Sequence, residues 1–447
     1  MKQINRILLL LGTLLLAGAV AVGLTACQKP EPAPVDTTVS AETTIPEETV
    51  PEETTEPTLA EKMGLDVKQA DLKEIMQSIF DGTVSLKETV MFIDKGDVKS
   101  LMYPIEGIVS VTSYDGKTTY EEGVDYVLED GKLKVTENSS IPCITSDVYY
   151  NHAGSIIKMG NKPLYWGESQ MKQWQVCVTY THADSWEGFV QESCLEVYED
   201  FVGKLIRGED VTVFFYGDSI TWGACSTFAE GVQPLQGAYP MLFVEALADL
   251  FDYKVAYADT GITTPYACHP VPTTDYVAGD RGTITYVNTA IGGWTSSDGV
   301  NNFDRYVAEQ VEKFGCDLFV LAYGMNDGLY STGLTKKNLT TMIDSMSALN
   351  PDVSVMIIAT MTPHPGTNWE YRPIQQQEGV FLDLAERYRG EGKAVAVACV
   401  YSTSMSILEH KTFNDYAGNN INHPNDWFYR VYAQTMLQTL IGYENMN

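Results

Sequence analysis

Four short polar segments of this chain carry the residue types that acyl-transfer chemistry needs. GDSITWG (217–223) places Ser219 where an apolar strand pattern turns into a helix pattern, and NNINHPND (419–426) holds His423, one of only six histidines. A serine hydroxyl attacks at neutral pH only when a base such as an imidazole removes its proton. Each segment alone also fits a structural role, because Gly-Asp-Ser caps helices and Asn-Pro pairs form turns.

The two other segments could stabilise the anion that such an attack creates. NTAIGGWTSSDG (288–299) is rich in glycine, which lets backbone N–H groups approach a ligand closely. YGMNDG (323–328) offers the side-chain amide of Asn326 as a further donor, although an Asn-Asp pair also forms ordinary turns. A donor aimed at a developing oxyanion is typically worth about 3 kcal/mol of the barrier.

Buried strands precede these segments. Apolar strands that alternate with helices predict a parallel sheet with helices on both faces. In such sheets the active groups gather at the carboxyl ends of the strands. The predicted strands are VTVFFYGDS (211–219), ITYVNTAIGG (284–293), CDLFVLAYGMND (316–327), DVSVMIIATMTP (352–363) and AVAVACVYS (394–402), and helix patterns cover 239–251 and 302–315.

The sequence before this domain has a different pattern of apolar and polar residues. After a helix predicted over 65–80, short alternating runs such as WQVCVTYTH (174–182) are separated by Asp-Gly steps at 115–116 and 130–131. Asp-Gly between alternating runs favours β-hairpins. We therefore expect a mostly β, sandwich-like accessory domain over 61–200.

The four segments, in this order and each after a strand, resemble the blocks of the SGNH (GDSL-like) hydrolase family over about 208–447. The resemblance implies a flavodoxin-like three-layer α/β domain, which we assign to 201–447, and a reaction that needs no cofactor and no metal. It makes Ser219 the nucleophile, with its own N–H an oxyanion donor. Gly293 and Asn326 become the other two donors, and His423 the general base.

One position departs from the family pattern. The family has Asp three residues before its His, whereas this chain has Asn420 there. Losing the carboxylate in the matching role costs a serine protease about 10⁴ in rate. Three hypotheses stay open: a Ser–His dyad with Asn420 or a backbone carbonyl orienting His423, which we favour; Asp415 as a substitute carboxylate; or a weakened or inactive site. Asp218 is expected to hold the loop beside the nucleophile.

Several residues near strand ends are candidates to line the substrate cleft. Trp222, Trp294 and Tyr323 offer flat faces that could pack against a sugar ring, and His364 lies in a shaped loop between two prolines. The segment 225–282 is longer than the fold requires, and we expect it to contribute to the rim.

The amino terminus resembles a lipoprotein export signal. A basic head and a long apolar run end in LTAC (24–27), similar to a lipobox in which Cys27 is lipidated, so 1–27 is predicted to be a signal peptide. The alternative is an uncleaved membrane anchor. Residues 28–60 are rich in Pro, Thr and acids without an aromatic residue, which predicts a disordered tether. Both alternatives place the folded part outside the cytoplasmic membrane.

The net charge and the cysteine content restrict the classes of binding partner that we expect. A formal net charge of −30 argues against binding of nucleic acid and against adhesion to anionic lipid. We therefore expect the protein to contact the membrane only through lipidated Cys27. The other seven cysteines contain no CxxC pair, which indicates mostly free thiols and no cysteine-based metal site.

These observations predict a lipid-anchored, extracytoplasmic serine esterase that hydrolyses O-acyl, in particular O-acetyl, esters on carbohydrate, with acetylated plant glycans such as xylan as the first substrate. The alternatives are a non-catalytic glycan-binding lipoprotein whose hydrolase domain has decayed at Asn420, and a lipase or thioesterase of the same family. An ordinary histidine pKa predicts activity that rises through roughly pH 6 to 7.

Overall fold

The computed structural model describes residues 76, 78–262, 272, 274–328, 331–370 and 372–442. The predicted signal peptide and tether lie outside these residues, as does the helix expected over 65–80 apart from residues 76 and 78–80. All of the described residues belong to one compact unit. Within the described ranges, no helix is both long and apolar enough to cross a membrane.

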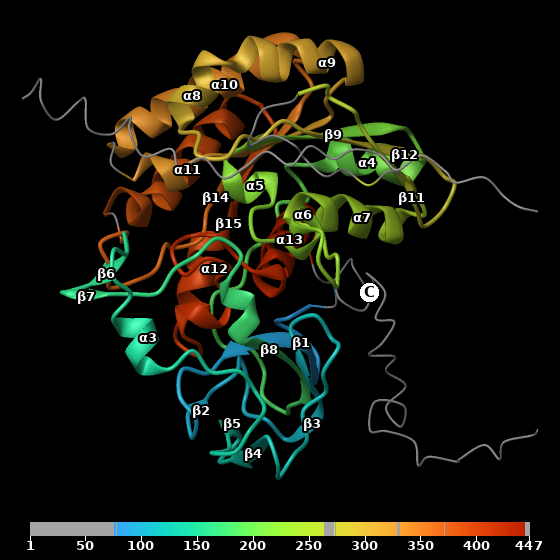
Figure 1. The fold of residues 1–447 in the computed structure, drawn as a ribbon. Coiled ribbons are helices and arrows are strands. Elements are labelled where there is room, and N and C mark those ends of the chain that lie inside the picture. Colours follow the sequence, from blue (N-terminus) through green and yellow to red (C-terminus); the bar gives the residue numbers. More distant parts are fainter. Residues whose placement is uncertain are drawn as a thin grey trace, which may run out of the picture. The chain divides into compact units, whose positions relative to one another are not determined.

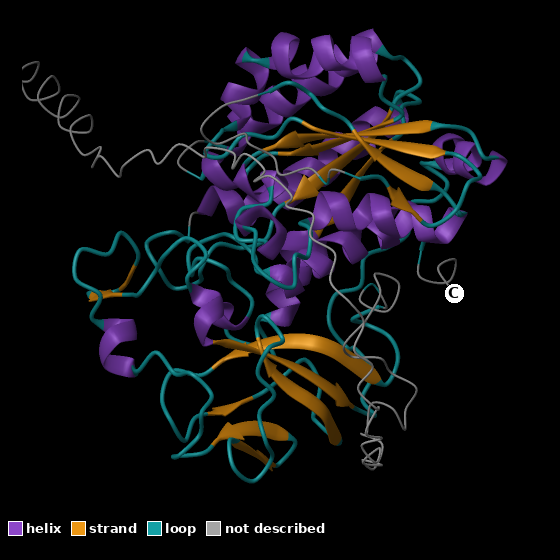
Figure 2. Cartoon of the chain, turned by 45° about the vertical axis from the view of Figure 1, so that its right-hand side comes forward, coloured by secondary structure: helices purple, strands orange, loops and turns teal. Residues whose placement is uncertain are grey.

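A seven-stranded sheet forms the centre of the carboxyl-terminal domain (Figure 2). Six of its strands run parallel, and only the short edge strand β11 is antiparallel to its neighbour. All five strands predicted from apolar runs are confirmed, and the short strands β10 and β11 are the two that the apolar pattern missed. The order across the sheet is β11 (Tyr276–Val277), β10 (Lys254–Tyr257), β12 (Thr283–Asn288), β9 (Val211–Gly217), β13 (Leu318–Ala322), β14 (Ser354–Ala359) and β15 (Val395–Cys399).

Helices cover both faces of this sheet, which confirms the three-layer α/β fold (Figure 1). Successive residues of β9 point to opposite faces, so Val213 and Phe215 enter one apolar core while Phe214 and Tyr216 enter the other. One face carries α4 (Glu199–Arg207), α7 (Tyr239–Phe251), α12 (Val400–Ile407) and α13 (Asp426–Ile441). The other carries α8 (Ser296–Asn301), the π-helical turn η2 (Asp304–Ala308), α9 (Glu309–Phe314), α10 (Thr332–Leu349) and α11 (Arg372–Gly390).

The region before this domain is mostly β, as predicted. Between β4 and β5, Asp130 and Gly131 have φ angles of 49° and 71°, which is the left-handed pair that a tight hairpin turn requires. One antiparallel sheet has the strand order β1 (Val84–Met91), β8 (Gln175–Thr181), β3 (Gly107–Ser113). A second has the order β2 (Val98–Lys99), β5 (Lys132–Val135), β4 (Tyr126–Glu129), and a third is the pair β6 (Lys158–Met159) and β7 (Lys162–Pro163). The region also contains the helix α3 (Ser146–Tyr150) and the 3-10 turn η1 (Met171–Trp174).

Helix α13 joins the two regions. Every residue from Asp426 to Ile441 is buried, because the helix packs between α7 and β15 on one side and β1 on the other. Its guanidinium group at Arg430 donates hydrogen bonds of 2.9 and 2.8 Å to the carbonyls of Leu86 and Lys87 in β1. Ten of its sixteen residues are apolar or aromatic, and its polar side chains, Arg430 among them, are buried as well because the helix is enclosed.

A buried ion pair also spans the two regions. The ammonium group of Lys411, in the loop after α12, contacts the carboxylate of Glu88 in β1, and both side chains are fully buried. The same ammonium donates to the carbonyl of Thr89 at 2.8 Å, and Glu88 accepts further bonds from Met102 N–H at 2.9 Å and Tyr180 Oη–H at 2.7 Å. Glu88 therefore has a full set of donors.

Removing the cation should destabilise the protein strongly. We expect Lys411→Met to lower the free energy of unfolding by about 3–5 kcal/mol, because it leaves the Glu88 carboxylate buried without its counter-charge. Urea denaturation measures the loss. The exposed pair Lys134–Glu129 supplies the control, and Lys134→Met should cost at most about 1 kcal/mol. Glu88→Gln/Lys411→Met should be more stable than Lys411→Met; a double variant that is no better would contradict the charge argument.

Candidate active site

Ser219 lies on a tight turn between β9 and the single helical turn α5 (Ser219–Trp222), with 8% of the residue exposed. The turn needs the glycine that precedes it. A Cβ at Gly217 would lie 2.4 Å from Thr221 Oγ1 and 2.5 Å from the carbonyl oxygen of Ala322, so no side chain fits. The close approach of these three segments presents Ser219 at the carboxyl edge of the sheet.

Two polar side chains hold this turn. Asp218 caps α5 by accepting a hydrogen bond of 3.0 Å from the N–H of Ile220, and burial raises the pKa of its carboxyl to about 7. Asn288, at the end of β12, donates from Nδ2 to the carbonyl of Thr221 at 2.8 Å. Asp218 thus lies where the sequence placed it, as a loop-holding residue beside the serine.

His423 reaches Ser219 from a segment 204 residues later in the chain. Its Nε2 lies 2.9 Å from Ser219 Oγ, which is hydrogen-bonding distance. The imidazole is mostly enclosed, with 10% of the side chain exposed. A nucleophile and a base held in such contact are the arrangement required for proton removal from the hydroxyl.

The two predicted oxyanion segments border the same turn. The N–H of Ile291 donates to the carbonyl of Gly217 at 3.0 Å, and Gly293 has a φ of 79°, which favours glycine. The pairing of β13 with β9 brings Asn326 to this edge, where its Nδ2 donates to the carbonyl of Trp294 at 2.9 Å. An amide nitrogen carries two hydrogens, so one remains to meet an oxyanion.

The far side of the His423 ring contacts three side chains. Nδ1 lies 3.0 Å from Glu168 Oε2, 3.0 Å from Asn419 Nδ2 and 3.7 Å from Cys225 Sγ. The sequence did not point to Glu168, which lies 255 residues before the histidine in an ordinary loop of the β region. The only signal was indirect, because the missing family carboxylate leaves its place to be filled from elsewhere.

The structure places neither predicted orienting residue against His423, and both expectations are corrected. Asn420 turns away and donates from Nδ2 to the carbonyl of Tyr165 at 2.6 Å. Asp415 lies in a separate buried network, where its carboxylate accepts a bond of 3.3 Å from Lys99. Their proximity in sequence to the histidine does not bring their side chains to its ring.

Two of the predicted cleft residues are buried instead. Tyr323 is 1% exposed and packs edge-on against Tyr216 with ring centroids 5.3 Å apart, so it belongs to the core. His364 is enclosed, stacks on Phe413 and places Nδ1 3.0 Å from the carbonyl oxygen of Asn420. Burial lowers the pKa of His364 to about 4. It supports the loop that carries His423 and is too enclosed to line a cleft.

The remaining rim predictions are tested only in part. Trp222 and Trp294 are half-buried, and Trp294 packs edge-on against Tyr306 at 4.8 Å. Part of the segment 225–282 forms the helix α6 (Thr227–Glu230), α7 and β10. Residues 263–271 and 273 lie outside the described residues, so a role at the rim stays a prediction.

His423 also belongs to a group of side chains of metal-ligating types. In the part of the chain that the structure describes, one group of His, Cys and acidic side chains, formed by Glu168, Cys225 and His423, brings its ligand atoms within 4.8 Å of one another. Spacing in the sequence gave no indication of it. Hydrogen bonding to the imidazole already accounts for this proximity. The six described cysteines are free thiols, as expected: Cys143, Cys177, Cys194, Cys225, Cys316 and Cys399.

A comparison with family models matches a large part of the domain that carries the Ser–His contact. Residues 270–431 match the model of the GDSL-like Lipase/Acylhydrolase family. The chain therefore contains a GDSL-like lipase/acylhydrolase domain with the SGNH hydrolase fold. The match includes Gly293, Asn326 and His423 and begins after Ser219, which the tertiary structure brings to the histidine.

Solved structures that resemble this chain do so distantly. A two-domain esterase active on acetylated mannans shares 16% identity at a TM-score of 0.39, over 56% of this chain and 54% of that one. A carbohydrate esterase family 3 protein from Talaromyces cellulolyticus shares 19% at a TM-score of 0.34, over 51% and 96%. This chain thus spans about half the length of the two-domain esterase. A search of curated proteins found no match. At these TM-scores the likenesses carry no argument about substrate.

Proposed function

We propose that this protein is a serine esterase that removes O-acyl groups, in particular acetyl groups, from carbohydrate. The observation that carries the proposal is the 2.9 Å contact between Ser219 Oγ and His423 Nε2 in a GDSL-like domain. The carboxyl edge of a parallel sheet is where such folds carry their chemistry.

The proposed reaction follows from the residue types. His423 removes the proton of Ser219 as its oxygen attacks the ester carbonyl. The oxyanion is then held by the N–H groups of Ser219 and Gly293 and by the amide of Asn326. Collapse expels the alcohol, which takes the proton from the imidazolium, and leaves an acyl-enzyme. Water activated by the same histidine releases the acid and restores the serine.

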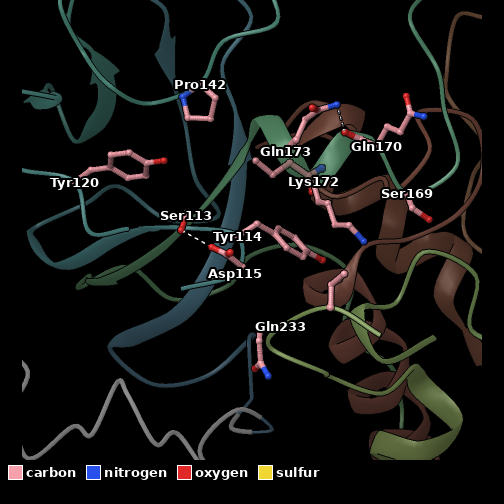
Figure 3. A pocket seen from close by; sticks show the side chains of 12 residues that line it. Ser113, Tyr114, Asp115, Tyr120, Pro142, Ser169, Gln170, Lys172, Gln173 and Gln233 are labelled. Carbon is pink, nitrogen blue, oxygen red and sulfur yellow. Dashed lines mark hydrogen bonds between the residues drawn. The ribbon is translucent and has the colours of Figure 1, made fainter. Parts of the chain in front are cut away.

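A pocket borders the loop that carries Glu168 (Figure 3), and we infer that it receives a polyhydroxylated part of the substrate. It has a volume of about 460 Å³, within the range of small-molecule sites. Its wall includes Ser169, next to Glu168, and the Ser169 hydroxyl lies 3.9 Å from Cys225 Sγ. Tyrosine rings with amide side chains suit the apolar faces and hydroxyl groups of sugars. The lining includes Tyr114, Tyr120, Gln170, Gln173, Gln175 and Gln233.

The rival interpretation, a decayed glycan-binding domain, loses its main support. Its ground was the amide at position 420, which removes the carboxylate expected by the family pattern. A carboxylate is nevertheless present at the Nδ1 atom of His423, supplied by Glu168 at 3.0 Å. Anchoring to the outer face of the membrane through lipidated Cys27 is part of the proposal, and incorporation of labelled fatty acid would test it.

Release of acetate from polysaccharides tests the function. The full chain should release acetate from acetylated xylan or mannan, and the Ser219→Ala variant should release none. Chemically deacetylated glycans are the matched blanks, while tributyrin and a long-chain acyl-CoA represent the lipase and thioesterase alternatives. Hydrolysis of these two without acetate release would reject carbohydrate as the substrate. Inactivity on every ester would reject the enzyme and favour a binding protein.

A further inference from the structure

We propose that Glu168 is the positioning residue of this site: its carboxylate accepts the Nδ1 proton of His423 and so keeps the Nε2 lone pair directed at Ser219. This inference rests on the proposed esterase function. Glu168 lies in the loop between β7 and η1, outside the family-matched segment, so the mostly β region completes the catalytic group.

The orientation of a neighbouring amide shows why a carboxylate is needed. Asn419 Oδ1 accepts hydrogen bonds from three backbone N–H groups, those of Ile421 at 2.9 Å, Asn422 at 3.0 Å and His423 at 3.0 Å. Rotating the amide by 180° would set its NH₂ group against all three donors. Its Nδ2 is therefore fixed on the side that faces Nδ1 of the histidine, 3.0 Å away.

The number of hydrogens on the Asn419 amide and on the His423 ring decides which atom donates in each contact. Asn419 Nδ2 carries two hydrogens, and two acceptors other than the ring lie nearby, Glu168 Oε1 at 3.3 Å and Asn422 Oδ1 at 3.2 Å. Nδ1–H of His423 then donates to Glu168 Oε2 at 3.0 Å. Every donor has an acceptor, and Nε2 keeps a free lone pair toward the serine hydroxyl. This is the tautomer that can remove a proton.

Without the carboxylate the same neighbours favour the wrong tautomer. The Asn419 amide would donate to an unprotonated Nδ1, and the ring proton would reside on Nε2. That nitrogen would then present N–H to Ser219 Oγ and could not act as a base. The carboxylate of Glu168 thus competes directly with a fixed amide donor.

The loop that carries Glu168 is held against the histidine loop by the residue that replaces the family's Asp. The Nδ2 of Asn420 donates to the carbonyl of Tyr165, three residues before Glu168, and also to Tyr149 Oη at 3.1 Å. The N–H of Gly167 donates to the carbonyl of Asn419 at 3.4 Å. Asn420 therefore anchors the loop that supplies the replacement carboxylate.

Three of the eight described residues other than glycine that have a positive φ lie at this cluster. Ser169, Cys225 and Asn420 have φ angles of 65°, 69° and 67°, a left-handed conformation that costs free energy for residues other than glycine. Each is next to, or part of, the set of residues around the histidine Nδ1. Such strain persists where the surrounding structure enforces a functional geometry.

The charges around His423 favour the same pairing of His423 with Glu168 as the hydrogen bonds do. The titratable groups that face His423 are Glu168, Cys225 and Asp218. Burial lowers the pKa of His423, but its contacts with Cys225 and Glu168 outweigh burial and raise the pKa to about 10. Burial likewise raises the pKa of the Glu168 carboxyl, yet the contact with the histidine brings it below its usual value. The Glu168 side chain is 58% exposed, so water weakens this pairing relative to a fully buried triad.

The raised pKa revises the expected pH profile. A general base works only when neutral, so raising its pKa moves the acid limb of kcat to higher pH. We therefore expect the wild-type limb above pH 7, not between pH 6 and 7. Removing the carboxylate lowers the histidine pKa and moves the limb to lower pH.

Replacement of Glu168 tests the role through rate and pH together. Glu168→Gln should lower kcat for p-nitrophenyl acetate between about 10²- and 10⁴-fold, with KM nearly unchanged because Glu168 touches the base and not the ester. Its acid limb should move to lower pH. Glu106→Gln, an exposed acid of the same region, should match the wild type. EDTA in every assay removes any metal ion as a cause. A kcat within about threefold of the wild type, or a loss with an unmoved limb, would overturn the proposal.

Nitrogen-15 NMR reads the tautomer without turnover, so this test stands even if the esterase function fails. In Ser219→Ala protein above the limb, His423 should carry its proton on Nδ1, and adding Glu168→Ala should move it to Nε2. An unchanged tautomer overturns the proposal. Thermal melting by circular dichroism confirms that each variant is folded.

A rescue variant separates a chemical role from a structural one. Asn419→Asp keeps the oxygen that accepts the three N–H bonds and replaces Nδ2 with a carboxylate oxygen 3.0 Å from Nδ1. Glu168→Gln/Asn419→Asp should therefore recover at least tenfold in kcat over Glu168→Gln. Failure to recover, in a variant that melts like the wild type, would count against a carboxylate at Nδ1 as the requirement.

Discussion

Replacement of Ser219 by alanine should abolish ester hydrolysis, lowering kcat for p-nitrophenyl acetate by about 10⁶-fold. The reason is covalent: without the hydroxyl no acyl-enzyme forms, and the imidazole 2.9 Å away has no proton to remove. The fold should be unaffected, because the residue sits at a turn whose geometry depends on Gly217 and Asp218.

Covalent labelling provides the control for this result. A fluorophosphonate probe should modify the wild type at Ser219 and leave Ser219→Ala unlabelled, with mass spectrometry locating the adduct. Turnover by the variant equal to that of the wild type would reject the serine mechanism. Labelling at another serine would place the nucleophile elsewhere.

Replacement of His423 by alanine should cost about as much as loss of the serine, and the two losses should not add. Ser219→Ala/His423→Ala should retain the same residual rate as either single variant, because the two side chains act as one unit. That residual rate comes from the oxyanion donors and substrate binding alone. Kinetics with p-nitrophenyl acetate on all three variants measures this.

An exposed histidine near Trp186 offers the matched control. His410→Ala should keep the wild-type kcat, because this exposed ring packs on Trp186 and not on Ser219. The centroids of the His410 and Trp186 rings are 5.2 Å apart. If His423→Ala lost less than about tenfold, or if the double variant were far slower than both singles, His423 would not be the base for Ser219.

The proposed site makes the mostly β region part of the catalytic machinery. The buried contacts of Arg430 and Lys411 with β1 fix this region on the hydrolase domain, and Asn420 holds the loop that carries Glu168. The same loop borders the pocket through Ser169. In the proposed mechanism, one short segment thus borders the pocket and orients the base.

Much of the fold was predictable from local pattern. Buried parallel strands are continuous apolar runs, so β9, β12, β13, β14 and β15 could be recognised without any tertiary information. The edge strand β11 and the short β10 lack that signature and were missed. Ser219 and His423 were identified because they occur in short segments of characteristic type and order. The family resemblance implied that they act together, and the structure shows their contact at 2.9 Å.

The sequence by itself determined the α/β architecture, the nucleophile and base candidates, and the absence of the usual carboxylate at position 420. Only the tertiary structure showed that Glu168 places a carboxylate beside His423. Tyr323 and His364 are buried because packing, which local pattern does not encode, covers them. Glu168 lies 255 residues from the histidine in a loop without periodicity or motif, so no spacing rule could pair them. A side-chain hydrogen bond depends on position in space, and here hydrogen bonds from Asn420 to Tyr165 and from Gly167 to Asn419 hold the Glu168 loop against the His423 loop.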